Sequence, residues 1–199
     1  GEKRAQYYGL ISHLDTAVGA VLDRLRQHGL ENDTLVIFSS DNGGGGNNNK
    51  PLRGGKAQMW EGGLRVPMIA RWPGRIQPGT KSDHVCAFWD FMPTCAELLG
   101  EQPPTGIDGV SILPTLLGRS EQQRKHRYLY WELDNQQAVR MDDWKAIRLQ
   151  PAQNIQLFNL KTDLSEQKDV AAEHPDLVAR FAEILASGRT DSEVFPLKR

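Results

Sequence analysis

The sequence predicts an α/β fold that ends in a small four-stranded antiparallel sheet with a packed helix. Apolar residues recur at helical spacing over 10–25, and a short β-branched and aromatic run, 34–38, follows after a polar turn. A helix, a short turn and a buried strand make half of an α/β repeat. Further along, short apolar segments alternate with turn-like residues, which is typical of an antiparallel meander.

The α/β part is expected to cover residues 1–122. Its elements should be a helix over 10–25 that stops at Gly29, strands over 34–38 and 66–72, a helix over 90–99 with Asp90 as its N-cap, and a short helix over 111–117. Pro67 should lie at the start of its strand, because proline cannot donate to the ladder. Two strands are too few for a stable parallel sheet. We therefore expect a piece of a larger domain, which is poorly stable or exposes apolar surface when isolated.

The sheet-plus-helix part is expected to cover residues 123–199, after a boundary near 119–124. The four strands should cover 128–133, 138–141, 144–149 and 155–160. The final helix carries its apolar residues on one face, and these are Leu177, Val178, Phe181, Ile184 and Leu185. No internal repeat is visible.

Composition and charge exclude several classes of function. The 199 residues are 39% hydrophobic and 25% charged, which is typical of a globular protein. The formal net charge of -1 gives no electrostatic case for binding nucleic acid or for a polybasic membrane anchor. No apolar run approaches the roughly 20 residues of a membrane span. We expect neither nucleic acid as a partner nor a membrane-spanning segment.

The two cysteines and the first residues say little about the compartment. Cys86 and Cys95 lie in an apolar stretch, and we expect buried free thiols rather than a disulfide. There is no zinc pattern. The chain runs from Gly1 directly into a helical pattern, without a charged and then apolar signal region.

The stretch from Ser39 to Lys56, SSDNGGGGNNNKPLRGGK, allows three interpretations: a phosphate-binding loop, a flexible linker or part of a metal site. A phosphate loop needs G-x-x-x-x-G-K-[ST], but Lys50 replaces its first glycine and Ala57 replaces its hydroxyl. Glycine and asparagine tolerate positive φ, so residues 44–49 fit a plain surface loop.

The two ends of this stretch are not explained by a plain loop. Asp41 and Asn42 follow a buried strand at its carboxyl end, where open α/β sheets bind ligands. Their oxygens suit Ca²⁺ or Mg²⁺, although Asp-Asn-Gly is also a good turn. Lys56 follows Arg53-Gly54-Gly55, whose glycines let an oxyanion approach, although a solvated lysine is the favoured interpretation of Lys56 taken alone. Glu61 to Arg65 is expected to hold an internal Glu–Arg pair.

Taken together, these segments resemble the type I sulfatase family of the alkaline phosphatase superfamily. The resemblance rests on FSSDNG followed by LRGGKAQMWEGGLRVPMIARWPG, with support from DFMPTCAELLG, DGVSILPTLLG and LFNLKTDLSEQKDVAAEHP. It implies a large mixed α/β sheet flanked by helices, then the small antiparallel sheet. It also implies that Asp41 and Asn42 bind a divalent cation, usually Ca²⁺ with Mg²⁺ or Mn²⁺ as alternatives, and that Lys56 is catalytic and contacts the sulfate.

The resemblance also implies parts that this sequence lacks. The family's nucleophile is a formylglycine made within a C/S-x-P/A-x-R signature, and neither cysteine here fits that signature. We therefore expect a C-terminal fragment of a sulfatase that is inactive alone, with the missing N-terminal part of the domain as its partner. The alternatives are a phosphonate or phosphate ester hydrolase, or a non-catalytic remnant. Family membership suggests a periplasmic or secreted protein.

The resemblance implies a sulfated small molecule or glycan as the substrate. Trp60, Trp89 and Trp131 are candidates for stacking on a sugar, with core packing the favoured interpretation for Trp89 alone. Contact with the substrate is the less favoured interpretation for Asn47, Asn48 and Asn49. The five histidines show no pairing with a nucleophile, and we expect them to be structural or exposed.

Overall fold

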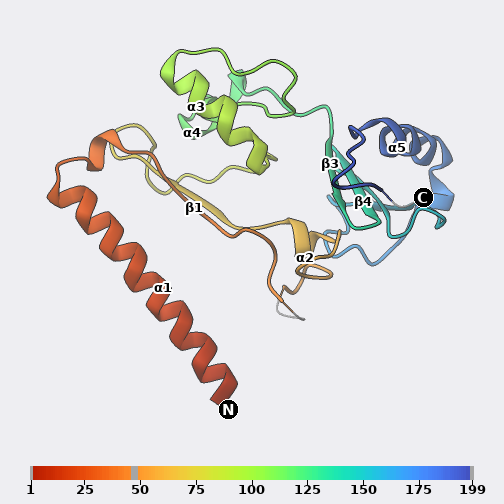
Figure 1. Cartoon of the computed structure of the whole chain (residues 1–199), viewed down its shortest axis with the longest axis horizontal. Coiled ribbons are helices and arrows are strands. Elements are labelled where there is room, and N and C mark those ends of the chain that lie inside the picture. Colours follow the sequence, from red (N-terminus) through yellow and green to blue (C-terminus); the bar gives the residue numbers. More distant parts are fainter. Residues whose placement is uncertain (1, 46–48, 198–199) are drawn as a thin grey trace. The chain divides into compact units, whose positions relative to one another are not determined.

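A computed structural model describes residues 2–45 and 49–197 of the chain (Figure 1). The residues form two compact units that interleave along the sequence. The first unit contains Gly1–Phe38, Ile69–His84 and Leu113–Gln123, and the second contains Ser39–Met68, Val85–Ile112 and Arg124–Arg199. The predicted division into 1–122 and 123–199 stays a prediction.

The first unit contains a long helix whose apolar residues are exposed. Helix α1 (Glu2–Gln27) ends before Gly29, whose φ of 70° lies in the left-handed region. It starts earlier than its apolar periodicity predicted. Leu10 is 69% exposed and Val21 58%, and Tyr7, Ile11 and Leu14 are exposed as well. The expectation of exposed apolar surface is confirmed for this helix. In the described part of the chain, no helix is long and apolar enough to cross a membrane.

Two short strands, β1 (Val36–Ser39) and β2 (Met68–Arg71), pair in a two-stranded sheet. Both predicted strands are confirmed, and Pro67 precedes β2 as expected. The 3-10 helix η1 (Glu31–Asp33) leads into β1. The Arg71 guanidinium binds the Glu31 carboxylate at 2.5 Å, which ties the end of β2 to η1. The first unit is completed by α4 (Leu113–Leu116) and the 3-10 helix η3 (Ser120–Gln122).

Helix α3 (Phe91–Leu99) belongs to the second unit and follows the 3-10 helix η2 (Phe88–Asp90). Asp90 occupies the predicted N-cap position of α3, but its side chain makes no capping hydrogen bond to the helix. Its buried carboxylate instead accepts hydrogen bonds from the Ala87 and Val110 N–H groups, at 2.7 and 2.8 Å, and binds His126 Nε2 at 2.9 Å. Both carboxylate oxygens of Asp90 are thus bound by groups outside α3 and are not used to cap the helix.

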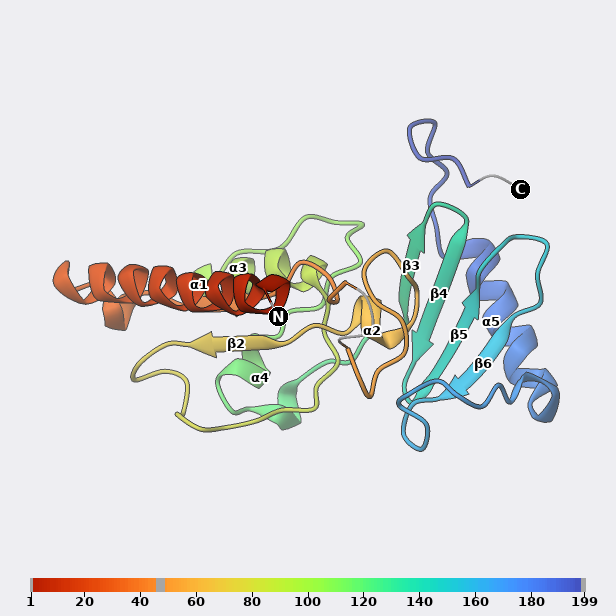
Figure 2. The same cartoon turned by 90° about the horizontal axis from the view of Figure 1, so that it is seen from below.

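The second unit also contains the predicted antiparallel sheet. Its strands β3 (Leu129–Leu133), β4 (Gln136–Met141), β5 (Trp144–Arg148) and β6 (Gln156–Asn159) lie in sequence order, and every neighbouring pair is antiparallel. Helix α5 (Pro175–Ser187), preceded by the 3-10 helix η4 (Ala171–Glu173), runs alongside this sheet (Figure 2). The meander and the final helix are therefore confirmed.

The two faces of the four-stranded sheet pack against different segments. Because side chains alternate along a strand, Val139 and Ala146 face one way and Ala138 and Ile147 the other. The first face packs against Phe181 and Leu185 of α5. The second face packs against Met59 and Trp60, which come shortly after Lys56 in sequence. The segment that follows Lys56 thus packs directly on this face of the sheet.

The cysteines follow the prediction only in part. Both are free thiols, but Cys86 is only half-buried and Cys95 is exposed. Cys95 was expected to be buried because its neighbours are apolar. It lies instead on an exposed position of α3, since only some positions of a nine-residue helix can face a core at once.

Candidate active site

The predicted metal ligands lie directly after β1. Asp41 is exposed and Asn42 is half-buried. The Ser39 hydroxyl donates to the Pro67 carbonyl at 2.9 Å, and the Ser40 hydroxyl donates to the Asn42 carbonyl at 2.8 Å. These two hydroxyls shape the turn that follows β1. Asp41 and Asn42 therefore lie at the carboxyl end of the strand, as predicted.

Backbone packing joins this turn to the segment around Gly62. The Gly43 N–H donates to the Gly63 carbonyl at 3.0 Å. A Cβ at Gly43 would lie 1.7 Å from the Gly62 carbonyl oxygen, so the position admits only glycine without movement of the backbone. At Gly62 a Cβ would lie 2.4 Å from the Gly54 carbonyl oxygen. Glycine is needed here for close approach of three backbone segments.

The same packing brings the Lys56 segment beside the Asp41–Asn42 turn. The Lys56 N–H donates to the Gly44 carbonyl at 3.2 Å. The Asn49 side chain binds both backbone groups of Gly44, accepting from its N–H at 2.9 Å and donating to its carbonyl at 2.7 Å. Asn49 also donates to the Gly54 carbonyl at 2.9 Å. Asn49 therefore closes the loop, whereas Asn47 and Asn48 lie outside the described residues.

The charged ends of Asp41 and Lys56 have no ion pair or side-chain hydrogen bond within residues 2–45 and 49–197. Both side chains are exposed. Asn42 Nδ2 donates to the Gly43 carbonyl at 3.2 Å, and this leaves its amide oxygen available as a ligand. The segment thus presents two side chains with oxygens that can bind a cation, and one ammonium group that can bind an anion. In the described part of the chain, none of these groups is used in a contact with another side chain.

These donors fit part of a site for a hard divalent cation. Ca²⁺ takes six to eight oxygen ligands and Mg²⁺ takes six. Asp41 and Asn42 supply two, and no group of three or more His, Cys, Asp or Glu residues that could hold a metal occurs among the described residues. The remaining ligands would have to come from residues beyond those described.

Ala57 occupies a backbone conformation that favours glycine. Its φ is 65°, in the left-handed region, which costs a residue with a Cβ about 1–2 kcal/mol. Glycine adopts this conformation without that cost. The positive φ shows that alanine strains the loop directly after Lys56.

A buried charged cluster lies behind the lysine loop, and the sequence did not predict it. Lys145 of β5 is fully buried, and its Nζ lies 2.9 Å from Glu61 Oε1 and 2.8 Å from Glu166 Oε1. Glu61 belongs to the short helix α2 (Glu61–Leu64) and is also buried. A lysine at an inward position of an apolar strand was the available signal, because such a lysine needs a buried counter-charge.

The expected pair between Glu61 and Arg65 is present but long, at 3.9 Å. Arg140 lies at the same distance from Glu61 Oε2. Lys145 is the closer partner of Glu61, because it comes from the sheet on which α2 lies.

Burial raises the pKa of the Glu166 carboxyl. Lys145 and the Glu61 N–H act in the opposite direction, since both favour the ionised form. Burial also raises the pKa of the Cys86 thiol, and the nearby Asp90 adds to this. A thiol with a raised pKa is a poor nucleophile at neutral pH, so Cys86 is not a substitute for the nucleophile that the sequence lacks.

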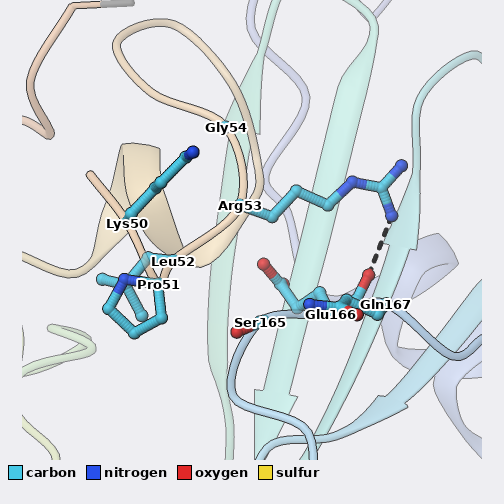
Figure 3. Close-up of a pocket in the computed structure, with 8 residues that line it drawn as sticks. All are labelled: Lys50, Pro51, Leu52, Arg53, Gly54, Ser165, Glu166 and Gln167. Carbon is cyan, nitrogen blue, oxygen red and sulfur yellow. Dashed lines mark hydrogen bonds between the residues drawn. The ribbon is translucent and has the colours of Figure 1, made fainter. Parts of the chain in front are cut away.

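A cavity of about 480 Å³ lies between the start of the lysine loop and the loop after β6 (Figure 3). It is lined by Lys50, Pro51, Leu52, Arg53, Gly54, Ser165, Glu166 and Gln167. Arg53 Nη1 donates to the Glu166 carbonyl at 2.8 Å, the bond drawn in Figure 3. The Arg53 guanidinium also stacks over the Trp60 ring at 3.6 Å. Trp60 is a core residue rather than a free platform for a sugar.

The remaining candidates have structural contacts. Trp89 and Trp131 are half-buried, with ring centroids 6.1 Å apart. His126 is bound to the buried Asp90, as the structural interpretation of the histidines expected.

Comparison with known proteins decides the family. Residues 2–101 match the family model described as Sulfatase, and residues 55–189 match the model described as N-sulphoglucosamine sulphohydrolase, C-terminal. The chain belongs to the sulfatase family. This confirms the resemblance and the fold class, a mixed α/β domain of alkaline-phosphatase type followed by the small antiparallel sheet.

Three similar proteins illustrate the relationship. The steryl-sulfatase of Rattus norvegicus is 37% identical over 169 residues, which cover 73% of this chain and 28% of that protein. The structure of Ps i-CgsB in complex with k-i-k-neocarrahexaose is 30% identical with a TM-score of 0.79, covering 92% of this chain and 42% of that one. The phosphonate monoester hydrolase of Agrobacterium radiobacter is 25% identical with a TM-score of 0.68, covering 98% and 45%. This sulfatase chain thus spans less than half the length of each.

Proposed function

We propose that this chain is the C-terminal part of a sulfuric ester hydrolase. The observation that carries the proposal is the pair of adjoining segments that present Asp41, Asn42 and Lys56 with unused binding capacity. The length of its relatives and the match to a C-terminal family model support the view that the remaining site residues lie in a missing N-terminal part. Because that part would supply the nucleophile, we expect this chain to be inactive alone.

In the proposed mechanism, the residues of this chain bind and orient the sulfate ester. The Lys56 ammonium donates hydrogen bonds to sulfuryl oxygens and stabilises the negative charge that grows on them. Asp41 and Asn42 would hold a divalent cation, which we propose to be Ca²⁺ with Mg²⁺ or Mn²⁺ as alternatives. The cation, when bound, supplies further charge stabilisation, and a formylglycine in the missing part supplies the nucleophile. The backbone bonds through Gly43 and Gly44 preorganise the two segments.

The substrate is proposed to be a sulfated small molecule or glycan. A steryl-sulfatase among the relatives favours the first, and the complex of Ps i-CgsB with a hexaose favours the second. The likeness to a phosphonate monoester hydrolase supports a second candidate function, because a phosphonate group offers oxygens that Lys56 and the cation could bind in the same way. A periplasmic or secreted location remains a proposal based on the family.

The test is hydrolysis by the full-length protein that contains this chain. We expect turnover of 4-nitrophenyl sulfate to exceed turnover of 4-nitrophenyl phenylphosphonate. The variant Lys56→Ala should lower kcat/KM for the sulfate about 10²–10³-fold, because it removes one preorganised charge. The control Lys50→Ala removes a nearby exposed lysine and should leave the rate unchanged. Preference for the phosphonate would favour the second function, and absence of both activities would favour a non-catalytic remnant.

The metal proposal has its own measurement. In the full-length protein, Asp41→Ala should lower the content of bound divalent metal found by elemental analysis after dialysis, since it removes the only carboxylate of the pair. Asp108→Ala, which changes an exposed acid elsewhere in the second unit, should leave the metal content unchanged. Full metal occupancy in Asp41→Ala would remove Asp41 from the ligand set.

A further inference from the structure

The buried Lys145–Glu61–Glu166 cluster lies at the base of the loop that carries Lys56. Lys145 and the Glu166 side chain are 0% exposed, and Glu61 is 3% exposed. Burying three charges carries a large desolvation penalty, and well-packed apolar residues of similar size often serve stability as well or better. The apolar neighbours of Lys145 on this face of the sheet, such as Ile147 and Phe158, show that an apolar residue would suit the surroundings. Stability alone therefore does not explain the cluster.

The contacts of Glu166 give a more specific reason. Its Oε2 accepts the Glu61 N–H at 2.7 Å, and its carbonyl accepts Arg53 Nη1 at 2.8 Å (Figure 3). Arg53 comes three residues before Lys56 and Glu61 comes five after it. One residue of the loop after β6 thus holds both ends of the Lys56 loop. The Gly62 N–H closes the base by donating to the Arg53 carbonyl at 2.7 Å.

Glu166 adopts an unfavourable backbone conformation to make these contacts. Its φ of 53° lies in the left-handed region, which few residues with a Cβ adopt. Such a conformation persists where surrounding contacts determine it, and it is found most often at functional sites. Here the contacts are those with Lys145, Arg53 and Glu61.

We propose that Lys145 and Glu166 are positioning residues for Lys56, which set the place of the lysine loop through its two ends. The proposal rests on the proposed function, in which Lys56 binds the sulfuryl group. Lys145 acts as the shared counter-ion of Glu61 and Glu166. Without its charge, two buried carboxylates face one another, their repulsion separates them, and the loop moves off the sheet. Neither residue touches the substrate.

The decisive experiment is a double-mutant cycle in the full-length protein. Lys145→Met should lower kcat for 4-nitrophenyl sulfate about 10- to 100-fold with a smaller change in KM, because a small misplacement of a catalytic group is costly. In a Lys56→Ala background the same change should have less than about a twofold further effect, since the residue to be positioned is gone. Lys145→Arg should restore part of the rate. Independent, multiplicative losses in kcat would overturn the proposal.

A second variant keeps the test usable if Lys145→Met fails to fold. Arg53→Met removes the bond to the Glu166 carbonyl and the stacking of the guanidinium on Trp60, and it changes a residue that is itself exposed. It should lower kcat, and this loss should also vanish in the Lys56→Ala background. A loss that persists in that background would count against positioning.

Hydrogen exchange separates failure of this proposal from failure of the proposed function. Amides of the peptide 53–61 should exchange faster in Lys145→Met than in the full-length wild type. The control Lys161→Met changes an exposed lysine of the same unit and should leave that exchange unchanged. If the wild type hydrolyses no sulfate ester, the proposed function fails, but hydrogen exchange still tests whether Lys145 and Glu166 hold the Lys56 loop in place. Unchanged exchange in Lys145→Met would show that they do not.

Discussion

At the scale of single residues, the candidate site depends on glycines that have no chemistry of their own. Gly43 lies between the proposed ligands Asp41 and Asn42 and the loop that carries Lys56. It bonds to Gly63 and leaves no room for a Cβ. Side chains at this point would separate the two halves of the site, so the absence of a side chain is as important as the charges beside it.

Gly43→Ala should therefore damage both stability and activity. The added methyl group would overlap the Gly62 carbonyl, and relief of that overlap should cost about 1–3 kcal/mol of the free energy of unfolding. Thermal unfolding and sulfatase assays of the full-length protein measure the two effects. Gly45→Ala is the matched control, because a Cβ there has nothing within 4 Å. Equal behaviour of the two variants would contradict the close packing described for Gly43.

At the scale of elements, the four-stranded sheet connects helix α5 to the site loop through polar as well as apolar contacts. Gln137 of β4 is fully buried and donates from Nε2 to the Tyr130 hydroxyl at 2.7 Å and to the Leu185 carbonyl of α5 at 3.2 Å. Its amide oxygen accepts from Arg148 Nε at 3.0 Å. The Tyr130 hydroxyl in turn donates to Glu132. A single polar chain thus crosses β3, β4, β5 and α5.

This polar chain predicts an alkaline transition. Burial, with a contribution from Glu132, raises the pKa of Tyr130 to about 12, against about 10 for an unfolded tyrosine. Between pH 10 and 12 the folded state holds a proton that the unfolded state has lost, so the stabilising contribution of Tyr130 is complete below pH 10 and is lost as the pH rises to 12. The difference in unfolding free energy between wild type and Tyr130→Phe should shrink over this range. Denaturant unfolding at several pH values measures it, and a constant difference would contradict the assignment.

At the scale of the whole molecule, the chain has two units and an unequal distribution of apolar surface. The second unit buries two apolar clusters, one on each face of its sheet. Helix α1 of the first unit leaves Tyr7, Tyr8, Leu10, Ile11, Leu14 and Val21 exposed. Contiguous apolar surface of this kind marks a contact with further protein. Relatives more than twice as long as this chain agree with that interpretation.

The isolated 199-residue chain should accordingly bind 1-anilinonaphthalene-8-sulfonate and show no turnover of 4-nitrophenyl sulfate. Exposed apolar surface binds the dye, and the proposed nucleophile lies outside the chain. Dye fluorescence and the sulfatase assay check both points, with the full-length protein as the reference that binds less dye and turns over substrate. Turnover by the isolated chain would contradict the assignment of the nucleophile to a missing part.

Much of the fold could be predicted because it depends on local patterns. Short apolar segments between turn residues indicated the four strands of the meander, helical spacing indicated α1 and α5, and a start signal at Asp90 indicated α3. The main difference in bounds is that α1 begins at Glu2 rather than near residue 10. Asp41, Asn42 and Lys56 could be proposed because each stands next to a strand end or a glycine pair. Their roles stay predictions, since no metal or substrate tests them.

What the sequence by itself determined was the order of helices and strands, the family, and the residues whose charges suit a cation and a sulfate. Only the tertiary structure decided that Glu166 holds both ends of the lysine loop, that Lys145 is buried between two acids, and that Asp90 binds a distant loop and His126 rather than its own helix. The physical reason is the range of the contacts. Periodicity and turn chemistry act between neighbours, whereas Glu61 meets Glu166 across 105 positions of the chain, and nothing local in either segment encodes the partner.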